Sequence, residues 1–276
     1  MKKFVREQTS ERLKKLQAEV RHSAREPRDP DAIHDLRVSI RRLRQELRVF
    51  EAWFEAGRVK RVRGQLKTLM ERCAAVRNCD VAMEVLETAG FQDGRLTKRL
   101  EEERQRTQKE LARTLQVWRS KHRARRWRKN MDVGGADTDI GSTAKETARL
   151  LLPAMIDELF RAGRMAGRAG SSHYQLHQFR LVTKRVRYTL ELFAPSYGSK
   201  ADQIVEPLKT LQEKLGAIND CAATLKLITG SRAASAAVRR LVREREADFR
   251  AYWKRNFGPQ VRAQWKAVLG RPRTHK

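Results

Sequence analysis

The chain has 276 residues and carries 61 Lys and Arg against 33 Asp and Glu, a formal net charge of +28. It has no run of eighteen apolar residues and no apolar signal region near its N-terminus, so we expect neither membrane insertion nor secretion. Three cysteines are too few for a disulfide framework, which fits a cytoplasmic protein. The excess charge favours a polyanionic partner, because such a ligand relieves the self-repulsion of the compact chain.

The first part of the chain has a helical pattern, with apolar residues recurring at intervals of three and four. A first helix is expected over residues 1–25. Asp29 has the features of an N-cap and Pro30 those of a first helical residue, so a second helix is expected to begin there. We expect this helix to continue to about Ala56 and to end at Gly57.

The helical pattern continues through the rest of the chain, with one interruption. A third helix is expected over 59–88 and a long fourth over 95–130. Residues 131–142 concentrate Gly and Asp and lack periodicity, which is typical of a linker. Ser172 and Gln175 form a capping-box pattern within the second half. The helices expected after the linker cover 143–169, 173–194, 200–229 and 232–256.

The two halves of the chain repeat one motif. The segment HDLRVSIRRLR begins at His34, and HQFRLVTKRVR begins at His177. The string LKTL then occurs in both following helices, and Asn78-Cys79 corresponds to Asp220-Cys221. The sequence therefore predicts a tandem duplication, all-α, with two four-helix subdomains. The expected boundaries are 1–130 for the first half, 131–142 for the linker, 143–256 for the second half and 257–276 for a basic tail that contains a short helix.

Each motif helix places a row of cations beside an apolar face. Residues three and four apart share one side of a helix, and no acid interrupts the row from His34 to Arg44. Like charges at this spacing repel one another, so two such rows suggest a shared anion-binding groove rather than a solvated surface. Arginine suits phosphate because its guanidinium donates two parallel hydrogen bonds. The rows consist of His34, Arg37, Arg41 and Arg44 in the first half and His177, Arg180, Lys184 and Arg187 in the second.

The duplicated motif resembles that of the CHAD family, the conserved histidine α-helical domain. The resemblance covers about residues 3–256 and is most specific over 32–44, 177–193 and 208–220. It implies two four-helix subdomains related by a pseudo-twofold axis, with a basic cavity between them. It also implies binding of long-chain inorganic polyphosphate without catalysis, and location on polyphosphate granules for some members.

The resemblance assigns the polyphosphate-binding role to the motif residues by matching position. The two rows named above are carried over in full. Arg42 and Arg185 also match the family pattern, although they lie off the rows on the helical wheel. Asn78 stands where the family usually has Asp, whereas Asp220 keeps that residue. If the acid anchors a motif arginine, the first half holds its row differently.

The two motif histidines have two interpretations. Each lies near a helix N-terminus beside arginines, and both surroundings disfavour the imidazolium in the free protein. A bound polyanion reverses that balance, so one hypothesis is that binding protonates His34 and His177 and strengthens as the pH falls through about 6.5. The alternative is that each histidine only donates a hydrogen bond.

Other site chemistries receive less support from the sequence. His173 and His177 have a metal-ligand spacing, but no third ligand lies nearby, so no metal or other cofactor is expected. No nucleophile–base pair or Gly-rich phosphate loop occurs, so we do not expect an enzyme. Cys73, Cys79 and Cys221 are expected to be buried core residues.

A nucleic-acid-binding role remains as the alternative function. The basic run from Arg119 to Lys129 carries cations around the helix together with Trp118 and Trp127. It is interpreted either as a solvated helix end or as a contact for nucleic acid or for a long polymer. The sequence leaves oligomeric state, protein partners and preferred polymer length undetermined.

Overall fold

The computed structural model describes residues 1–130 and 143–270. These residues form ten α-helices and two short 3-10 helices, without a β-strand among them, which confirms the all-α class. The chain divides into two compact units. The first half of the chain and residues 223–237 make up what we call the N-terminal unit, and residues 139–222 and 238–276 make up the C-terminal unit. The predicted linker, residues 131–142, lies outside the described residues.

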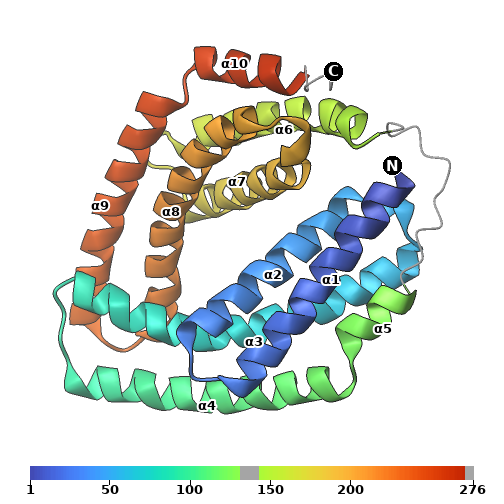
Figure 1. Ribbon diagram of the computed structural model, residues 1–276. Coiled ribbons are helices and arrows are strands. Elements are labelled where there is room, and N and C mark those ends of the chain that lie inside the picture. Colours follow the sequence, from blue (N-terminus) through green and yellow to red (C-terminus); the bar gives the residue numbers. More distant parts are fainter. Residues whose placement is uncertain (131–142, 271–276) are drawn as a thin grey trace. The chain divides into compact units, whose positions relative to one another are not determined.

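Five helices form most of the N-terminal unit. The first packs against the second, fourth and fifth, and the third packs against the second and fourth (Figure 1). As predicted, Asp29 caps the second helix, because its side chain accepts a hydrogen bond from the Asp31 N–H, and Pro30 is its first residue. The helices are α1 (Lys2–Arg25), α2 (Pro30–Val49), α3 (Ala56–Thr88), α4 (Gly94–Ser120) and α5 (Arg123–Asn130).

The expected end of the second helix was wrong. α2 ends at Val49, a 3-10 turn over Glu51–Trp53 follows, and Gly57 lies inside α3. Phe50 and Phe54 on either side of the turn are both buried. Two rings four residues apart would also share one face of a continuous helix, so the helix end is set by the backbone of Phe50, which leaves the helical region with φ −103° and ψ 20°.

The expected long fourth helix was also wrong, because it is two helices joined by a sharp corner. α4 ends at Ser120, and His122 has φ 46°, a left-handed conformation that histidine adopts more readily than most residues. Beyond the corner Trp127 packs edge-on against Trp118 with 5.2 Å between ring centroids. α5 thereby turns back against α1. The described part of the N-terminal unit therefore has five main helices instead of four.

The C-terminal unit is built from α6 (Ala144–Ala166), α7 (His173–Phe193), α8 (Ser199–Leu227), α9 (Arg232–Asn256) and α10 (Pro259–Gly270), with a 3-10 turn over Ala194–Ser196 after α7. The final turns of α8 and the first turns of α9 belong to the N-terminal unit. The predicted capping box at the start of α7 is confirmed, with reciprocal bonds between Ser172 and Gln175. The short helix expected in the tail is α10. It packs on α6, where Asp157 accepts hydrogen bonds from Arg262 and Lys266.

The cores of the two units differ in chemistry. Aliphatic side chains such as Leu36, Ile40 and Leu43 fill the N-terminal unit, together with one buried acid, Glu46. Burial raises the pKa of Glu46 to about 7, although the Thr9 hydroxyl donates a hydrogen bond to it and Arg12 lies 3.4 Å away. All three cysteines are buried, as predicted.

The C-terminal core adds a cluster of aromatic rings to its aliphatic side chains. Trp253 of α9 stacks on Phe257 with 4.6 Å between centroids and lies 5.7 Å from Phe160 of α6. Gly163 makes this contact possible, because a Cβ at that position would meet the Trp253 ring at 2.0 Å. The close approach of α6 to α9 therefore depends on the absence of a side chain at Gly163.

Candidate basic faces on α2 and α7

The predicted row on α2 lies beside the core face of that helix. Leu36, Ile40 and Leu43 are fully buried, whereas the arginines of the row are half-buried and His34 is exposed. Arginines at this depth keep their aliphatic stems against the protein and their charged ends near solvent. Within the N-terminal unit the structure therefore gathers His34, Arg37, Arg41 and Arg44 along one side of α2, with Arg42 also half-buried.

The neighbouring helix α3 adds cations that the sequence analysis did not select. Arg63 of α3 and burial together lower the pKa of Arg44, burial being the larger cause. Around Arg44 lies a surface cavity of about 490 Å³ whose other charged lining residues are Lys60, Arg63, Lys67 and one acid, Glu51. Glu51 accepts a hydrogen bond from Arg63 at 2.9 Å. The spacing of these α3 cations at three and four residues is the signal by which the sequence could have revealed them.

The surroundings of His34 disfavour its charged form. Partial burial lowers its pKa most, followed by Arg41 and Arg37 of the same helix, while Arg77 of α3 acts in the same direction. Asp35 acts in the opposite direction. Neutral histidine is favoured because the imidazolium would add another cation to a cationic face.

The row on α7 has a different setting within the C-terminal unit. The Nδ1 atom of His177 lies 3.1 Å from the Oδ1 atom of Asn219 on α8, a hydrogen bond across two helices. Arg180 and Lys184 are half-buried. Arg187 lies 3.5 Å from Glu191 and its guanidinium sits over the Tyr188 ring, 4.7 Å from the centroid. The last cation of this row is thus partly engaged by its own helix.

The two matched residues that lie off the rows have separate surroundings. Arg185 forms an ion pair with Glu158 of α6, which directs it toward that helix. Asn78 and Asp220, where the two copies differ, are both half-buried. Asp80, two residues after Asn78, forms an ion pair with Arg104 of α4.

The remaining site chemistries have little structural basis in the described ranges. His173 and His177 lie 6.4 Å apart between ring centroids. Residues 1–130 and 143–270 contain no cluster of three His, Cys, Asp or Glu side chains that could hold a metal ion. In the same ranges none of the helices combines the length and the apolar character needed to cross a bilayer.

Comparison with known proteins identifies the family. A family model described as the CHAD domain matches residues 7–229. The crystal structure of the CHAD domain from the plant Ricinus communis superposes with a TM-score of 0.70 at 22% identity, covering 99% of this chain and 93% of that one. PptA from Streptomyces chartreusis superposes with a TM-score of 0.58 at 15% identity, covering 98% and 99%. No curated protein sequence matches. At these identities the two structures establish a shared fold, and the match of the family model over most of the sequence shows that the chain belongs to the CHAD family.

Proposed function

We propose that the protein binds long-chain inorganic polyphosphate, without chemical conversion, through the cationic faces of α2 and α7. The observation that carries this proposal is the recurrence of one His-and-Arg row on two helices of matching sequence. A single basic helix has a simple explanation as a solvated surface. Two copies that keep both the cations and the adjoining apolar positions favour a retained binding role, in agreement with membership of the CHAD family.

The chemistry of the rows suits a polymer of phosphates better than a nucleic acid. Polyphosphate offers a charge at each unit and no bases, whereas proteins that bind single-stranded nucleic acid commonly stack bases on aromatic rings. Phe179 and Tyr188 are the two residues of type Phe, Tyr or Trp within the segments 34–44 and 177–188, and both are buried, Tyr188 under Arg187. Arginine–phosphate pairs are strong and frequently bidentate, so the rows supply the donors that such a polymer needs.

The cations of α3 extend the face on the N-terminal unit. Burial lowers the pKa of Arg44 most, and the positive charge of the nearby Arg63 lowers it further. A phosphate bound between these two arginines would attract both guanidinium groups and offset the repulsion between them. We therefore include Lys60, Arg63 and Lys67 in the proposed face.

Three finer features remain predictions from the family resemblance. These are a basic cavity shared by the two halves, their pseudo-twofold relation, and association with polyphosphate granules in the cytoplasm. Each of them concerns the assembled molecule or the cell rather than the faces described above. The binding experiment below tests the faces without assuming them.

The test is a titration of labelled long-chain polyphosphate at physiological salt. We expect Arg37→Gln/Arg41→Gln and Arg180→Gln/Lys184→Gln each to weaken binding by about tenfold or more, because each removes two charge-assisted contacts. The matched control is Arg113→Gln/Arg243→Gln, which removes the same charge from exposed positions on α4 and α9. Equal losses in the control and in the face variants would overturn the proposal, since only net charge would then matter.

Competition separates polyphosphate from nucleic acid. Single-stranded RNA, duplex DNA and tripolyphosphate are added to the preformed complex. We expect nucleic acids to displace the polymer only at large excess of phosphate, and affinity to fall steeply with salt through counterion release. Displacement by duplex DNA at equal phosphate concentration would favour the general nucleic-acid-binding alternative.

A further inference from the structure

A second cationic site of the N-terminal unit lies away from the α2 row, at the corner between α4 and α5. Here a cavity of about 320 Å³ opens between α1 and the corner. That volume is at the lower end of the range for small-molecule sites. Its lining contains Gln17, Val20 and Arg21 of α1, and Trp118, Arg119, His122, Arg123, Ala124 and Arg125 around the corner.

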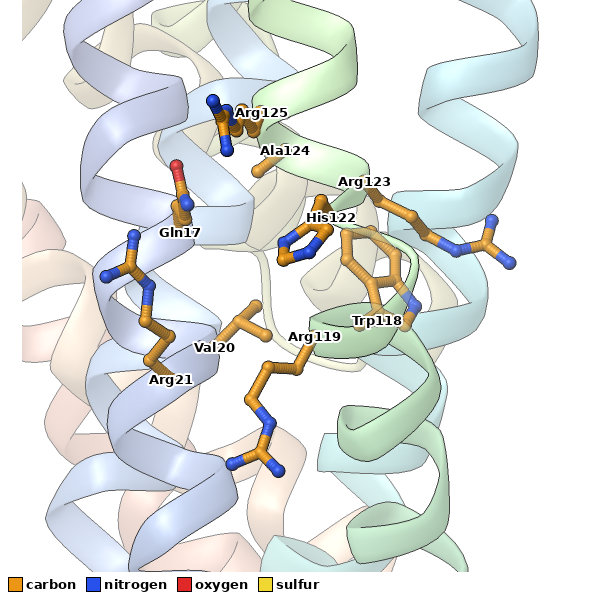
Figure 2. A pocket seen from close by; sticks show the side chains of 9 residues that line it. All are labelled: Gln17, Val20, Arg21, Trp118, Arg119, His122, Arg123, Ala124 and Arg125. Atoms are coloured by element: carbon orange, nitrogen blue, oxygen red, sulfur yellow. The ribbon is translucent and has the colours of Figure 1, made fainter.

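The lining combines an apolar floor with a cationic rim. Val20, Trp118 and Ala124 are buried, whereas Arg21, Arg119 and Arg125 are exposed. Figure 2 shows the Val20 side chain and the His122 ring directed into the space between the helices, whereas Arg123 points away from it. No acid lines the cavity. Among the described residues, none of the three exposed arginines forms an ion pair with an acid.

The backbone at the corner accounts for the placement of the imidazole. His122 has φ 46°, and this left-handed residue lets the chain reverse so that Arg119 before it and Arg125 after it face α1 together. Arg123 is held differently, with its guanidinium over the Trp118 ring at 5.6 Å from the centroid. The left-handed residue thus lies at the cationic cavity itself, and functional sites are where such backbone conformations gather.

We propose that this cavity binds a nucleoside phosphate. The phosphates would pair with Arg21, Arg119 and Arg125, the base would stack against the His122 ring above the apolar floor, and the Gln17 amide would bond the base edge. A bare polyphosphate satisfies the rim but gains nothing from Val20 and Trp118. A ligand with a planar base and a phosphate uses both parts of the lining.

This inference is independent of the polyphosphate proposal, because the two sites share no residue. Binding is measured by calorimetry with AMP and ATP, compared with adenosine, which lacks phosphate, and with tripolyphosphate, which lacks a base. A short single-stranded RNA distinguishes a free nucleotide from a nucleotide within a polymer. We expect AMP and ATP to bind more tightly than adenosine and than tripolyphosphate. Stronger binding of tripolyphosphate than of ATP, or binding of the RNA alone, would overturn the proposal.

Variants locate the site. Arg21→Gln/Arg119→Gln is expected to weaken ATP binding by about tenfold or more, whereas Arg113→Gln on α4 leaves it unchanged. His122→Asn keeps a residue that tolerates the left-handed backbone but removes the imidazole ring, so a loss of ATP affinity with normal thermal stability supports stacking. The indole N–H signal of Trp118, assigned with Trp118→Phe, should shift on addition of ATP. If ATP binds but neither the arginine pair nor the indole signal responds, the site lies elsewhere and the assignment is wrong.

Polyphosphate binding provides the cross-check. The variants at the corner should bind labelled polyphosphate as the unmodified protein does, and Arg37→Gln/Arg41→Gln should still bind ATP. Loss of both ligands in Arg21→Gln/Arg119→Gln would contradict a separate site. If the unmodified protein failed to bind polyphosphate, the proposed function would be wrong, whereas the nucleotide proposal would still be decided by the ATP measurements.

Discussion

Each motif histidine has cations three and seven residues ahead on its own helix, but the residues that it meets on the neighbouring helix differ between the two halves. His177 lies 3.1 Å from the amide oxygen of Asn219 on α8. At the offset that pairs Asn78 with Asp220, the counterpart of Asn219 is Arg77, and Arg77 is one of the cations that lower the pKa of His34. At this position the third helix of the second half has a hydrogen-bonding amide, Asn219, whereas the third helix of the first half has a positive charge, Arg77. The motif helices of the two halves are therefore similar in sequence, whereas the surroundings of their histidines differ because the helices packed against them differ.

The difference extends into the cores. The N-terminal unit buries Glu46 beside Thr9, and the C-terminal unit brings α6 and α9 together over Gly163. Stability in one half is therefore sensitive to pH, and in the other it is sensitive to side-chain volume. Four measurements test these contrasts.

The largest expected effect follows from Gly163→Ala. The added methyl group would lie 2.0 Å from a Trp253 ring that is itself stacked on Phe257, so it cannot be accommodated without displacing packed rings. We expect a loss of about 2 kcal/mol after the helix-forming gain of alanine is included, measured by urea unfolding. Gly216→Ala on α8 has no atom within 4 Å of the new Cβ and should stabilise the protein slightly. An equal change in the free energy of unfolding for the two variants would show that the close approach of Trp253 to Gly163 does not restrict side-chain size at that position.

Glu46→Gln should reveal the buried acid of the N-terminal unit. Because the pKa of Glu46 is raised to about 7, the folded state binds more protons than the unfolded state between about pH 4.5 and 7. Stability is then lost as the pH rises through this range and stays low above it. We expect the variant to be more stable than the unmodified protein by about 1–2 kcal/mol at pH 8 and similar to it near pH 5. Glu7→Gln, at an exposed position on α1, should show no such pH-dependent difference.

Polyphosphate affinity should depend on pH through the N-terminal face. Burial and the adjacent arginines lower the pKa of His34 in the free protein, and a bound polyanion raises it. The complex therefore takes up protons, and affinity should rise as the pH falls from 8 to 6. His34→Asn should reduce this dependence. A flat affinity across that range, with the fold intact, would favour the interpretation in which the histidine only donates a hydrogen bond.

The smallest effect is a direct titration of His34 by proton NMR. Arg77→Asn recreates the residue of the other half and removes one cation that acts on the ring, so the pKa of His34 should rise. A depressed histidine pKa costs stability as the pH falls below its ordinary value near 6.5, and the variant should lose less stability in acid than the unmodified protein. Arg61→Asn, an exposed change on the same helix, serves as the control. An unchanged His34 titration in Arg77→Asn would remove the proposed contrast between the halves.

The accuracy of the sequence analysis varied with the range of the interactions involved. The N-cap at Asp29 and the capping box at Ser172 depend on residues within one turn, and both were predicted correctly. The end of α2 and the corner at His122 were not, and the corner depends on where Trp118 and Trp127 find packing partners. The α3 cations around Arg44 have a helical spacing that is visible in the sequence, but only the packing of α3 on α2 shows that they lie beside the row.

The sequence by itself determined that the chain is helical, that its motif is duplicated, and which residues form the two rows. Periodicity and local capping decide those features, and both are encoded in neighbouring residues. The tertiary structure alone decided that His177 meets Asn219, that Arg63 faces Arg44, and that four cations and an imidazole surround a cavity at the α4–α5 corner. Such contacts join residues distant in the chain, and their geometry depends on how whole helices pack.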